Sequence, residues 1–239
     1  MLVENFYLDG TPTEEFLLDL PCVSYLVDLP HFALRQPVTC FVGDNGIGKS
    51  TLLEAIALNL EFDARGGRIA DPARVNRDSP LARNLRCTVK ENLQRGYFLR
   101  AETHSELLEA GSTEEERGGR SRLDPNIDLH SRSHGESLFD VIEEHVSGTG
   151  IYIFDEPEAG LSVVRQMALI AEIYQAVERG GQFIIATHSP ILLGYPGADI
   201  VELNSLGFER IDFASAEAVA ATREFLEDPR GSVDYILHG

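Results

Sequence analysis

The sequence predicts an α/β fold in one domain that spans residues 1–239. A length of 239 residues suits a single domain with a sizeable core. A short apolar run at Thr39–Val42 leads straight into a glycine-rich loop and then into a helical pattern. Two more apolar runs of strand length, Ile151–Phe154 and Phe183–Ala186, lie on either side of a helical stretch. Together these observations indicate an α/β domain.

The N-terminal part contains two predicted strands and one predicted helix. Val23–Leu29 and Thr39–Val42 are apolar runs of strand length. The spacing predicts a helix over Ser50–Leu60, because its apolar residues recur every three or four positions and share one face. These residues are Leu52, Leu53, Ile56, Ala57 and Leu60. Residues 61–95 are polar and rich in arginine.

The remaining elements follow from the same patterns. We expect a strand at Tyr97–Leu99, helices at Glu106–Ala110, Gly135–Val146, Ser162–Arg179 and Ser215–Leu226, and a hairpin of Asp199–Leu203 with Glu209–Phe213. Gly180 and Gly181 end the helix before them, and Pro229 stops the last helix of the chain. The charged, glycine-bearing stretch Gly111–Arg122 is expected to be a mobile loop.

Composition narrows the class of protein. No stretch approaches the roughly 18 to 20 apolar residues of a membrane span, so we expect no membrane insertion. Residues 1–34 contain acids but no Lys or Arg, which argues against a signal peptide. Cys22, Cys40 and Cys87 lack paired or metal-like spacing, which fits free thiols in the cytoplasm.

The formal net charge of −19 disfavours binding to nucleic acid over most of the surface. The one basic stretch is Arg65–Arg86. It is interpreted either as a solvated segment that balances acidic neighbours or as a contact surface for a partner or nucleic acid.

Gly43–Ser50 fits the phosphate-binding pattern Gly-x-x-x-x-Gly-Lys-Ser/Thr, known as the P-loop. Its glycines permit close approach of the backbone, whose N–H groups can hold phosphate oxygens at the start of the next helix. Lys49 would reach the β- and γ-phosphates of ATP, and Ser50 would bind Mg²⁺. The predicted nucleotide-binding residues of this loop are Asn45, Gly46, Ile47, Gly48, Lys49, Ser50 and Thr51.

Asp155 and Glu156 end an apolar strand, where two adjacent acids are costly unless a cation or a catalytic role compensates. Asp155 is a predicted Mg²⁺ ligand, usually through water. Glu156 is the predicted catalytic group that orients or deprotonates the attacking water. Pro157 limits helix formation, so residues 158–162 should form a loop. An exposed acidic turn is the alternative.

Three more positions complete the series of motifs. His188 follows the strand Phe183–Ala186, in a Thr-His-Ser-Pro setting. Ser133-His134-Gly135-Glu136-Ser137 precedes a predicted helix, where such residues can cap the helix and can also bind an anion. Glu102 follows the strand near residue 98, and its carboxylate could meet Mg²⁺ or a bound water; an ordinary surface glutamate is the competing interpretation.

In this order, the motifs resemble those of the ATP-binding cassette (ABC) ATPases over residues of about 23 to 239. The matching segments are Gly43–Glu54, Phe98–Glu102, Ser133–Ser137, Asp155–Ser162 and Arg223–Pro229, which look like those of a bacterial group of stand-alone "AAA family" ATPases. The resemblance implies a mainly parallel central sheet with flanking helices, N-terminal antiparallel strands, and a small helical subdomain at about 103–146.

The resemblance also implies roles. His188 would contact the γ-phosphate and position the base. Ser133, Gly135 and Glu136 would bind the γ-phosphate held by the opposite copy of an ATP-dependent homodimer. His134 and Glu136 depart from the transporter signature Leu-Ser-Gly-Gly-Gln. Glu102 stands where transporters carry glutamine. An unidentified partner protein would use the resulting motion.

Three other functions stay open. The chain could be the ATP-binding subunit of a membrane transporter, which the short span between Glu102 and Ser133 disfavours. It could be a nucleotide-dependent binding switch, or a DNA-associated one, with little turnover; Glu156 argues against that, because a pure switch needs no base. A P-loop kinase would leave Ser133–Ser137 and His188 unexplained.

Overall fold

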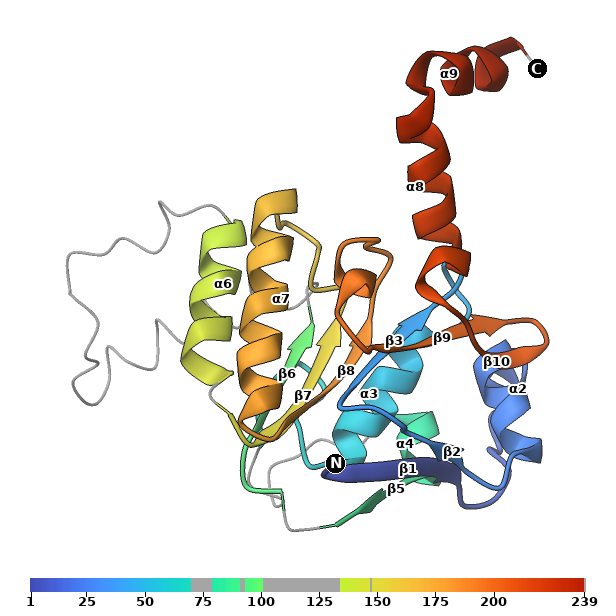
Figure 1. Ribbon diagram of the computed structural model, residues 1–239. Coiled ribbons are helices and arrows are strands. Elements are labelled where there is room, and N and C mark those ends of the chain that lie inside the picture. The colour runs from blue at the N-terminus through green and yellow to red at the C-terminus, as the bar shows by residue number, and fades with distance from the viewer. Residues whose placement is uncertain (70–78, 91–92, 101–133, 147, 239) are drawn as a thin grey trace.

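A computed structural model describes residues 1–69, 79–90, 93–100, 134–146 and 148–238 (Figure 1). Its helices are α1 (Glu15–Leu18), α2 (Pro21–Asp28), α3 (Lys49–Asn59), α4 (Pro80–Asn84), α6 (His134–His145), α7 (Val163–Glu178), α8 (Glu217–Glu227) and α9 (Pro229–His238). Its strands are β1 (Val3–Leu8), β2 (Phe32–Ala33), β3 (Val38–Val42), β4 (Gly67–Arg68), β5 (Leu85–Val89), β6 (Gly96–Arg100), β7 (Gly150–Asp155), β8 (Gly181–Ala186), β9 (Asp199–Asn204) and β10 (Gly207–Arg210).

The larger sheet has seven strands in the described part of the chain, in the order β10-β9-β3-β8-β7-β6-β4. Neighbouring strands from β9 to β6 are all parallel, whereas β10 and β4 pair antiparallel at the two edges. The predicted α/β class with a mainly parallel central sheet is therefore confirmed. Parallel order brings the carboxyl ends of β3, β7 and β8 to one edge of the sheet.

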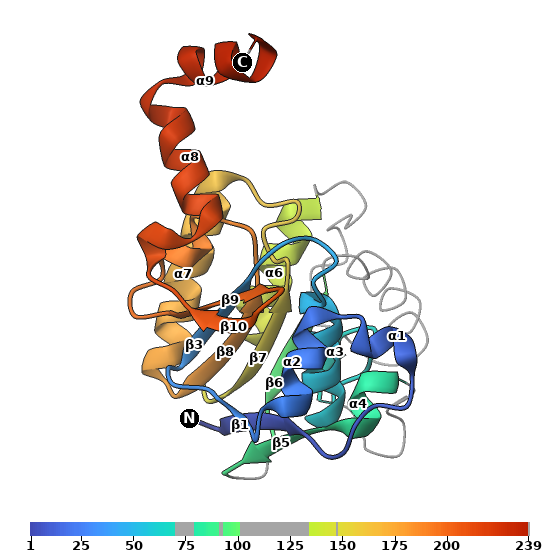
Figure 2. The ribbon, with the colours of Figure 1, turned by 90° about the vertical axis from the view of Figure 1, so that its right-hand side faces the viewer.

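Alternation along the buried strands divides the core into two halves. In β7, Ile151 and Ile153 pack on the side of α3, while Tyr152 and Phe154 pack on the side of α6 and α7. Figure 2 shows the sheet between these two groups of helices. A strand that is covered on both faces has a continuous run of apolar residues, and such runs allowed these strands to be predicted from the sequence.

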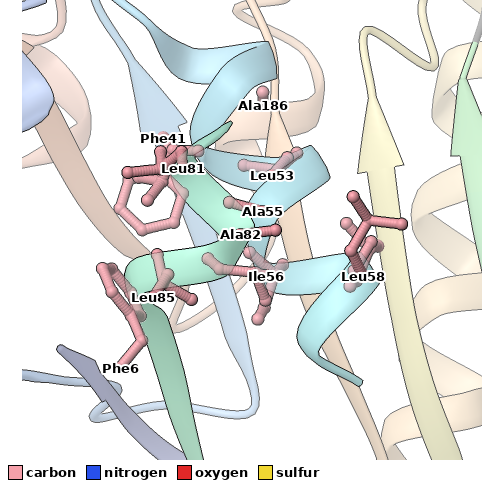
Figure 3. Packing of buried hydrophobic residues seen from close by; sticks show 14 of the residues in the cluster. Phe6, Phe41, Leu53, Ala55, Ile56, Leu58, Leu81, Ala82, Leu85 and Ala186 are labelled. Atoms are coloured by element: carbon pink, nitrogen blue, oxygen red, sulfur yellow. The ribbon is translucent and has the colours of Figure 1, made fainter. Parts of the chain in front are cut away.

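A second, antiparallel sheet of β2, β1 and β5 lies below α3 and matches the expected N-terminal antiparallel strands. Phe6 of β1 and Leu85 of β5 pack with Leu81 of α4 and Ile56 of α3 (Figure 3). The backbone N–H groups of Leu2 and Val3 also donate to Oε1 of Gln182, at 2.7 and 2.9 Å. The small sheet is thereby joined both to the back of the phosphate-loop helix and to the start of β8.

One predicted strand is wrong. Residues predicted as the strand Val23–Leu29 form helix α2, which begins at Pro21. Proline suits the first helical position because its fixed φ matches the helix and it has no N–H to leave unpaired. Cys22, Val23 and Leu26 share the buried face of α2. In the sequence, this helical spacing cannot be distinguished from the short apolar run of a strand.

The hairpin near the C-terminus is confirmed, but its second strand is β10, Gly207–Arg210, rather than Glu209–Phe213. Phe213–Ser215 instead forms a short 3₁₀ turn. Helix α8 ends before Pro229 as predicted, yet it is not the last helix. Pro229 opens α9, again at the first helical position. No element was predicted within the polar stretch 61–95, where the structure has β4, α4 and β5.

The other predicted strands and helices that lie in the described residues are present, with bounds shifted by no more than a few residues. The helix expected at Glu106–Ala110, the loop at Gly111–Arg122 and most of the subdomain at about 103–146 lie outside the described residues. Helices α8 and α9 project from the edge of the sheet where β3 ends (Figures 1 and 2). None of the described helices is long and apolar enough to cross a membrane.

Candidate functional site

The glycine loop joins β3 to α3 as the sequence predicts. Gly43, Gly46 and Gly48 have φ angles of 134°, 81° and 103°, in a region that other residues rarely adopt. Gly48 is the N-cap of α3, and a Cβ atom there would collide with the Cys22 sulfur of α2. The first N–H groups of α3 have no acceptor within the helix, so they are free of intrahelical bonds and face the loop. The backbone is thus shaped to hold an anion at the positive end of a helix.

Lys49 lies within this loop. Its side chain is buried, and Nζ donates to the carbonyl oxygens of Gly43 at 2.7 Å and Asp44 at 2.9 Å. Burial lowers the pKa of the Lys49 ammonium, while the nearby carboxylates of Glu156 and Asp155 act in the opposite direction. The ammonium is therefore held above the loop by acceptors that phosphate oxygens could replace.

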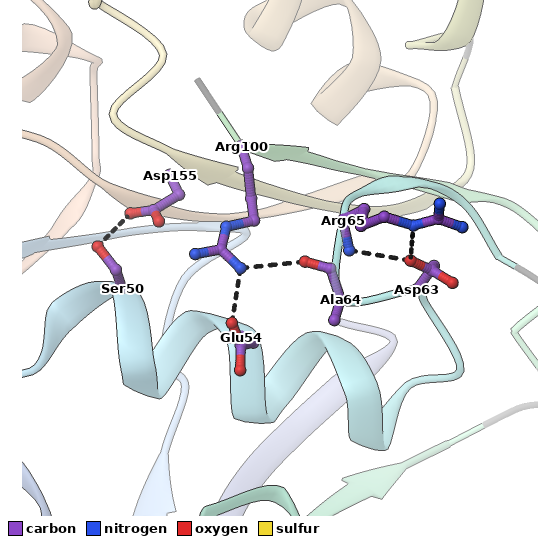
Figure 4. A network of polar contacts seen from close by, with 7 residues as sticks. All are labelled: Ser50, Glu54, Asp63, Ala64, Arg65, Arg100 and Asp155. Carbon is purple, nitrogen blue, oxygen red and sulfur yellow. Dashed lines mark hydrogen bonds and ion pairs between the residues drawn. The ribbon is translucent and has the colours of Figure 1, made fainter. Parts of the chain in front are cut away.

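Ser50 and Asp155 come together between α3 and the end of β7 (Figure 4). Ser50 is in the first turn of α3 and its Oγ donates to Oδ1 of Asp155 at 3.0 Å. Asp155 is the last residue of β7 and is buried. Two of the three predicted Mg²⁺ ligands, Ser50 and Asp155, therefore present oxygen atoms at one point beside Lys49.

Glu156 has a left-handed backbone conformation, with φ of 51°. The next residue is Pro157, whose ring disfavours the right-handed helical conformation at Glu156. The backbone N–H of Glu156 donates to the carbonyl of Ala186 at 2.9 Å, which fixes the residue between β7 and β8. A strained non-glycine residue persists only where its surroundings impose it, and such residues are enriched at active sites.

His188 lies across from Glu156. Its Nε2 is 3.9 Å from Oε1 of Glu156, and both side chains are nearly half exposed. This distance exceeds a direct hydrogen bond and leaves both groups accessible to a substrate. The structure therefore brings together Lys49, Ser50, Asp155, Glu156 and His188 at the carboxyl ends of three parallel strands, where ligands of open α/β sheets usually bind.

A cavity of about 330 Å³ continues from this edge. It is lined by Asp44, Asn45 and His188 on one side and by Glu217 and Ala221 of α8 on the other. The base of the C-terminal helices is thus part of the same surface as the glycine loop.

Some predicted site residues cannot be placed. Glu102 and Ser133 lie outside the described residues, although β6 ends at Arg100 and α6 begins at His134. Gly135 and Glu136 belong to the first turn of α6, and only their backbone is described. Their predicted roles stay predictions. Asn45, Gly46 and Ile47 occupy the loop, and Thr51 follows Ser50 in the first turn of α3.

Two sets of contacts around the site were not predicted from the sequence. Arg100 at the end of β6 donates from Nη1 to Oε2 of Glu54 at 2.6 Å and to the carbonyl of Ala64 at 3.0 Å (Figure 4). Its guanidinium ties β6 to α3. Glu158, after the two acids, accepts a hydrogen bond from the backbone N–H of His188. A third acid beside Pro157 was visible in the sequence, but its partner, 30 residues away, was not.

The arginines of the basic stretch Arg65–Arg86 that the structure describes are each paired with an acid. Arg65 lies 3.1 Å from Asp63, Arg68 lies 3.2 Å from Glu144, and Arg83 lies 3.1 Å from Glu14, measured between the charged atoms. Arg86 lies 3.7 Å from Asp9. Of the two interpretations, these contacts favour a segment that balances acidic neighbours, because the pairing offsets the positive charge that nucleic acid would need.

The oxygen atoms of Ser50 and Asp155 fit Mg²⁺, a hard cation that is usually bound by one or two carboxylates together with substrate phosphates. Among the residues that the structure describes, no group of three or more His, Cys, Asp or Glu side chains could hold a metal ion by itself. A site built from one hydroxyl and one carboxylate suits a metal that arrives with a nucleotide.

Comparison with known proteins agrees with this arrangement. A family model for an "AAA domain" matches residues 23–98, which contain the glycine loop. A second model, described as "AAA domain, putative AbiEii toxin, Type IV TA system", matches residues 128–194, which contain Asp155, Glu156 and His188. No curated protein matches the chain.

Several solved structures are similar. The chain aligns with a putative metal-chelate type ABC transporter at 16% identity and a TM-score of 0.50, over 94% of this chain and 90% of that chain. It also aligns with cbiO1 of Clostridium perfringens, part of an ABC transporter complex, at 18% identity and a TM-score of 0.46, over 87% and 90%. A dimeric ATP-binding cassette bound to ADP and Pi shares 16% identity and a TM-score of 0.45, over 75% and 87%.

The fold, the glycine loop and the two family matches together define the class of this protein. It has the fold and the glycine loop of P-loop NTPases, and residues 23–98 and 128–194 each match a model of an AAA domain. The chain is an ATPase and binds ATP. The resemblance found in the sequence is confirmed at this level.

Proposed function

We propose that two copies of this chain bind ATP and Mg²⁺ between them, head to tail, and that hydrolysis opens the pair and moves a partner protein. The observation that carries the proposal is the meeting of Ser50 and Asp155, 3.0 Å apart, beside the buried Lys49 and the pair Glu156 and His188. The groups that would bind the phosphate, bind the metal and position the attacking water all lie at one edge of the sheet.

Phosphate binding comes first. Lys49 would exchange the carbonyls of Gly43 and Asp44 for the β- and γ-phosphate oxygens, a charge-assisted contact that is stronger than the bonds it replaces. The N–H groups of residues 45–51 would hold the remaining oxygens at the start of α3. Mg²⁺, held by Ser50 and Asp155 and by Glu102 after β6, would supply positive charge to the transferred phosphoryl group.

Glu156 would then orient the attacking water and accept its proton. Its left-handed backbone and its bond to Ala186 hold the carboxylate at the end of β7. His188, 3.9 Å away, would contact the γ-phosphate and position that carboxylate. Catalysis by this site would rest mainly on placement and charge, as is usual for phosphoryl transfer.

The second copy would complete the site. In the opposite chain, Ser133, which precedes α6 in the sequence, would bind the γ-phosphate through its hydroxyl, and Gly135 and Glu136 in the first turn of α6 would bind it through helix N–H groups. A pair held together through ATP would come apart when the γ-phosphate is lost. This step would convert hydrolysis into motion of a partner protein.

Glu156→Gln tests the chemistry and the assembly together. Glutamine keeps the size of the side chain but cannot accept the proton, so turnover should fall by about 10²- to 10⁴-fold. Lys49, Ser50 and Asp155 are unchanged, so ATP should still bind and persist. Light scattering should therefore show a monomer without nucleotide and a dimer of Glu156→Gln with ATP and Mg²⁺.

Ser133→Arg, added to Glu156→Gln, should prevent that dimer, because it places a bulky cation where the opposite γ-phosphate would lie. It leaves the glycine loop of its own chain intact, so ATP binding by the monomer serves as the control. A wild-type rate for Glu156→Gln would show that the base is another group. A monomer in saturating ATP, or a dimer that tolerates Ser133→Arg, would rule out the head-to-tail pair.

We propose that the pair works in the cytoplasm, independently of a membrane transporter. The free thiols of Cys22 and Cys40, both buried, support a reducing compartment. Fractionation of cells tests this part. Co-purification with a membrane protein, and ATPase activity that depends on it, would favour the transporter alternative instead.

A further inference from the structure

Glu158 contacts the site through the backbone of His188 and has no role in the proposed chemistry. It follows Pro157 in the turn after β7, and its Oε1 accepts a hydrogen bond of 2.6 Å from the backbone N–H of His188. The carbonyl of Glu158 also accepts from the N–H of Leu161 at 2.9 Å, which closes the turn and orients the side chain. The carboxylate therefore joins the end of β7 to the loop after β8.

The position of the Glu158 carboxylate is unfavourable for the stability of the folded chain. Its second oxygen, Oε2, is covered by protein and has no hydrogen-bond partner in the described residues. A buried carboxylate oxygen that receives no hydrogen bond destabilises the folded chain. The Lys49 ammonium, whose charge is stabilised by Glu158 among other acids, offsets part of that cost. Such a residue persists where the bond it does make has a function.

A second contact runs parallel to the first. Ser189 Oγ donates to Oε1 of Gln166 in α7 at 2.6 Å, and Nε2 of Gln166 donates to the carbonyl of Leu161 at 3.0 Å. Ser189 Oγ also accepts from the N–H groups of Ile191 and Leu192, at 3.1 and 3.2 Å, and so fixes the turn after His188. These bonds hold the far side of His188, while Glu158 alone holds the N–H of His188 itself.

We infer that Glu158 is the positioning residue for His188: its carboxylate oxygen fixes the backbone of the histidine so that the imidazole stays beside Glu156. This inference rests on the proposed role of His188 in the function above. Without the bond, the His188 N–H would lose its acceptor and the imidazole would leave the position 3.9 Å from Oε1 of Glu156. Misplacement of a group by about 1 Å can cost about 100-fold in rate.

Steady-state kinetics of the full chain tests the inference. Glu158→Ala should lower kcat for ATP hydrolysis by about 10- to 100-fold while KM changes by less than about threefold, because the phosphate loop is untouched. Glu158→Gln keeps an oxygen that can accept from the His188 N–H and should restore kcat to within about threefold of wild type. Glu178→Ala removes an exposed acid at the C-terminal end of α7 and is the matched control.

A double-mutant cycle separates positioning from a general loss of structure. In a His188→Ala background, Glu158→Ala should lower kcat by less than about twofold further, because the residue on which it acts is already gone. Thermal melting of each variant checks that the chain still folds.

Three results would overturn the inference: unchanged kcat for Glu158→Ala, a Glu158→Gln variant as slow as Glu158→Ala, or full additivity with His188→Ala. If His188→Ala itself has wild-type kcat, the role of His188 in the proposed function is wrong and the inference falls with it. A slow His188→Ala variant beside an unaffected Glu158→Ala variant leaves the proposed function intact and overturns this inference alone.

Discussion

Ser50 and Asp155 are joined by a hydrogen bond of 3.0 Å from Oγ to Oδ1, although 105 positions separate them in the sequence. Ser50 belongs to α3, the helix after the phosphate loop, and Asp155 ends β7, directly before Glu156, the proposed catalytic base. Their contact fixes the position of the phosphate loop relative to Glu156. Each can be altered without changing the fold of the other, so the pair allows the metal site to be tested directly.

Asp155→Asn should remove the dependence of ATP binding on Mg²⁺. The amide keeps the shape of the side chain and can still contact Ser50, but it carries no charge for the cation. We expect affinity for ATP with Mg²⁺ to fall by about tenfold or more, to the value measured with EDTA. Isothermal titration with and without Mg²⁺ measures this. Glu209→Gln, an exposed acid on β10, is the control and should leave the Mg²⁺ effect unchanged.

Lys49→Ala should weaken ATP binding by at least about tenfold, because the β- and γ-phosphates lose their cationic partner. Lys90→Ala provides a matched control, since Lys90 is exposed and paired with Glu4 at 3.1 Å, far from the loop. Isothermal titration of both variants gives the comparison. Equal affinity of Lys49→Ala and wild type would refute the assignment of the phosphate loop.

Gly48→Ala should destabilise the chain more than Gly46→Ala. Both glycines have a positive φ, which costs an alanine about 1–2 kcal/mol. Only at Gly48 would the new Cβ also meet the Cys22 sulfur, whereas no heavy atom lies within 4 Å of the Cβ position at Gly46. Urea unfolding gives the two free energies of unfolding. Addition of Cys22→Ala should recover part of the free energy of unfolding that Gly48→Ala loses. If it does not, the contact with the Cys22 sulfur is not the cause of the loss.

The buried thiols predict a pH dependence. Burial raises the pKa of Cys22 and of Cys40 from 9.0 to about 12. The folded chain therefore keeps thiol protons that the unfolded chain releases above pH 9.0, so this contribution to the free energy of unfolding is full below pH 9.0 and declines as pH rises toward 12.

The reactive species is the thiolate, so a thiol reagent at pH 8 should not label Cys22 or Cys40 in the folded chain. It should label all three cysteines in denaturant. Mass spectrometry of the labelled peptides measures this. Rapid labelling of Cys40 in the folded chain would contradict its burial in β3.

Much of the sheet could be predicted because its central strands are covered on both faces and appear as unbroken apolar runs. The same criterion failed at Val23–Leu29, where an amphipathic helix of eight residues buries Cys22, Val23 and Leu26. Short apolar runs do not distinguish the two structures, and Pro21 was the better guide. Pro229 was interpreted only as a stop, although proline also starts helices.

The candidate site also has a part that could be predicted from the sequence and a part that could not. Lys49, Ser50 and the pair Asp155–Glu156 lie in short motifs whose spacing carries the chemistry, and the structure brings them together. The bond between Glu158 and the N–H of His188 depends on how two loops fold against each other. No local pattern encodes such a contact. The pairing of Arg83 with Glu14 was hidden for the same reason.

The strand order has a consequence for how the protein is made. β3, which leads into the phosphate loop, is synthesised early, but both of its neighbours in the sheet come late: Val38 pairs with Phe183 and Thr39 pairs with Asp199. A ribosome that has made the first hundred residues has therefore exposed an apolar strand with both edges unpaired, a species prone to aggregation. We expect nascent chains to acquire nucleotide binding only when β8 and β9 have emerged, and until then to depend on chaperones to shield β3.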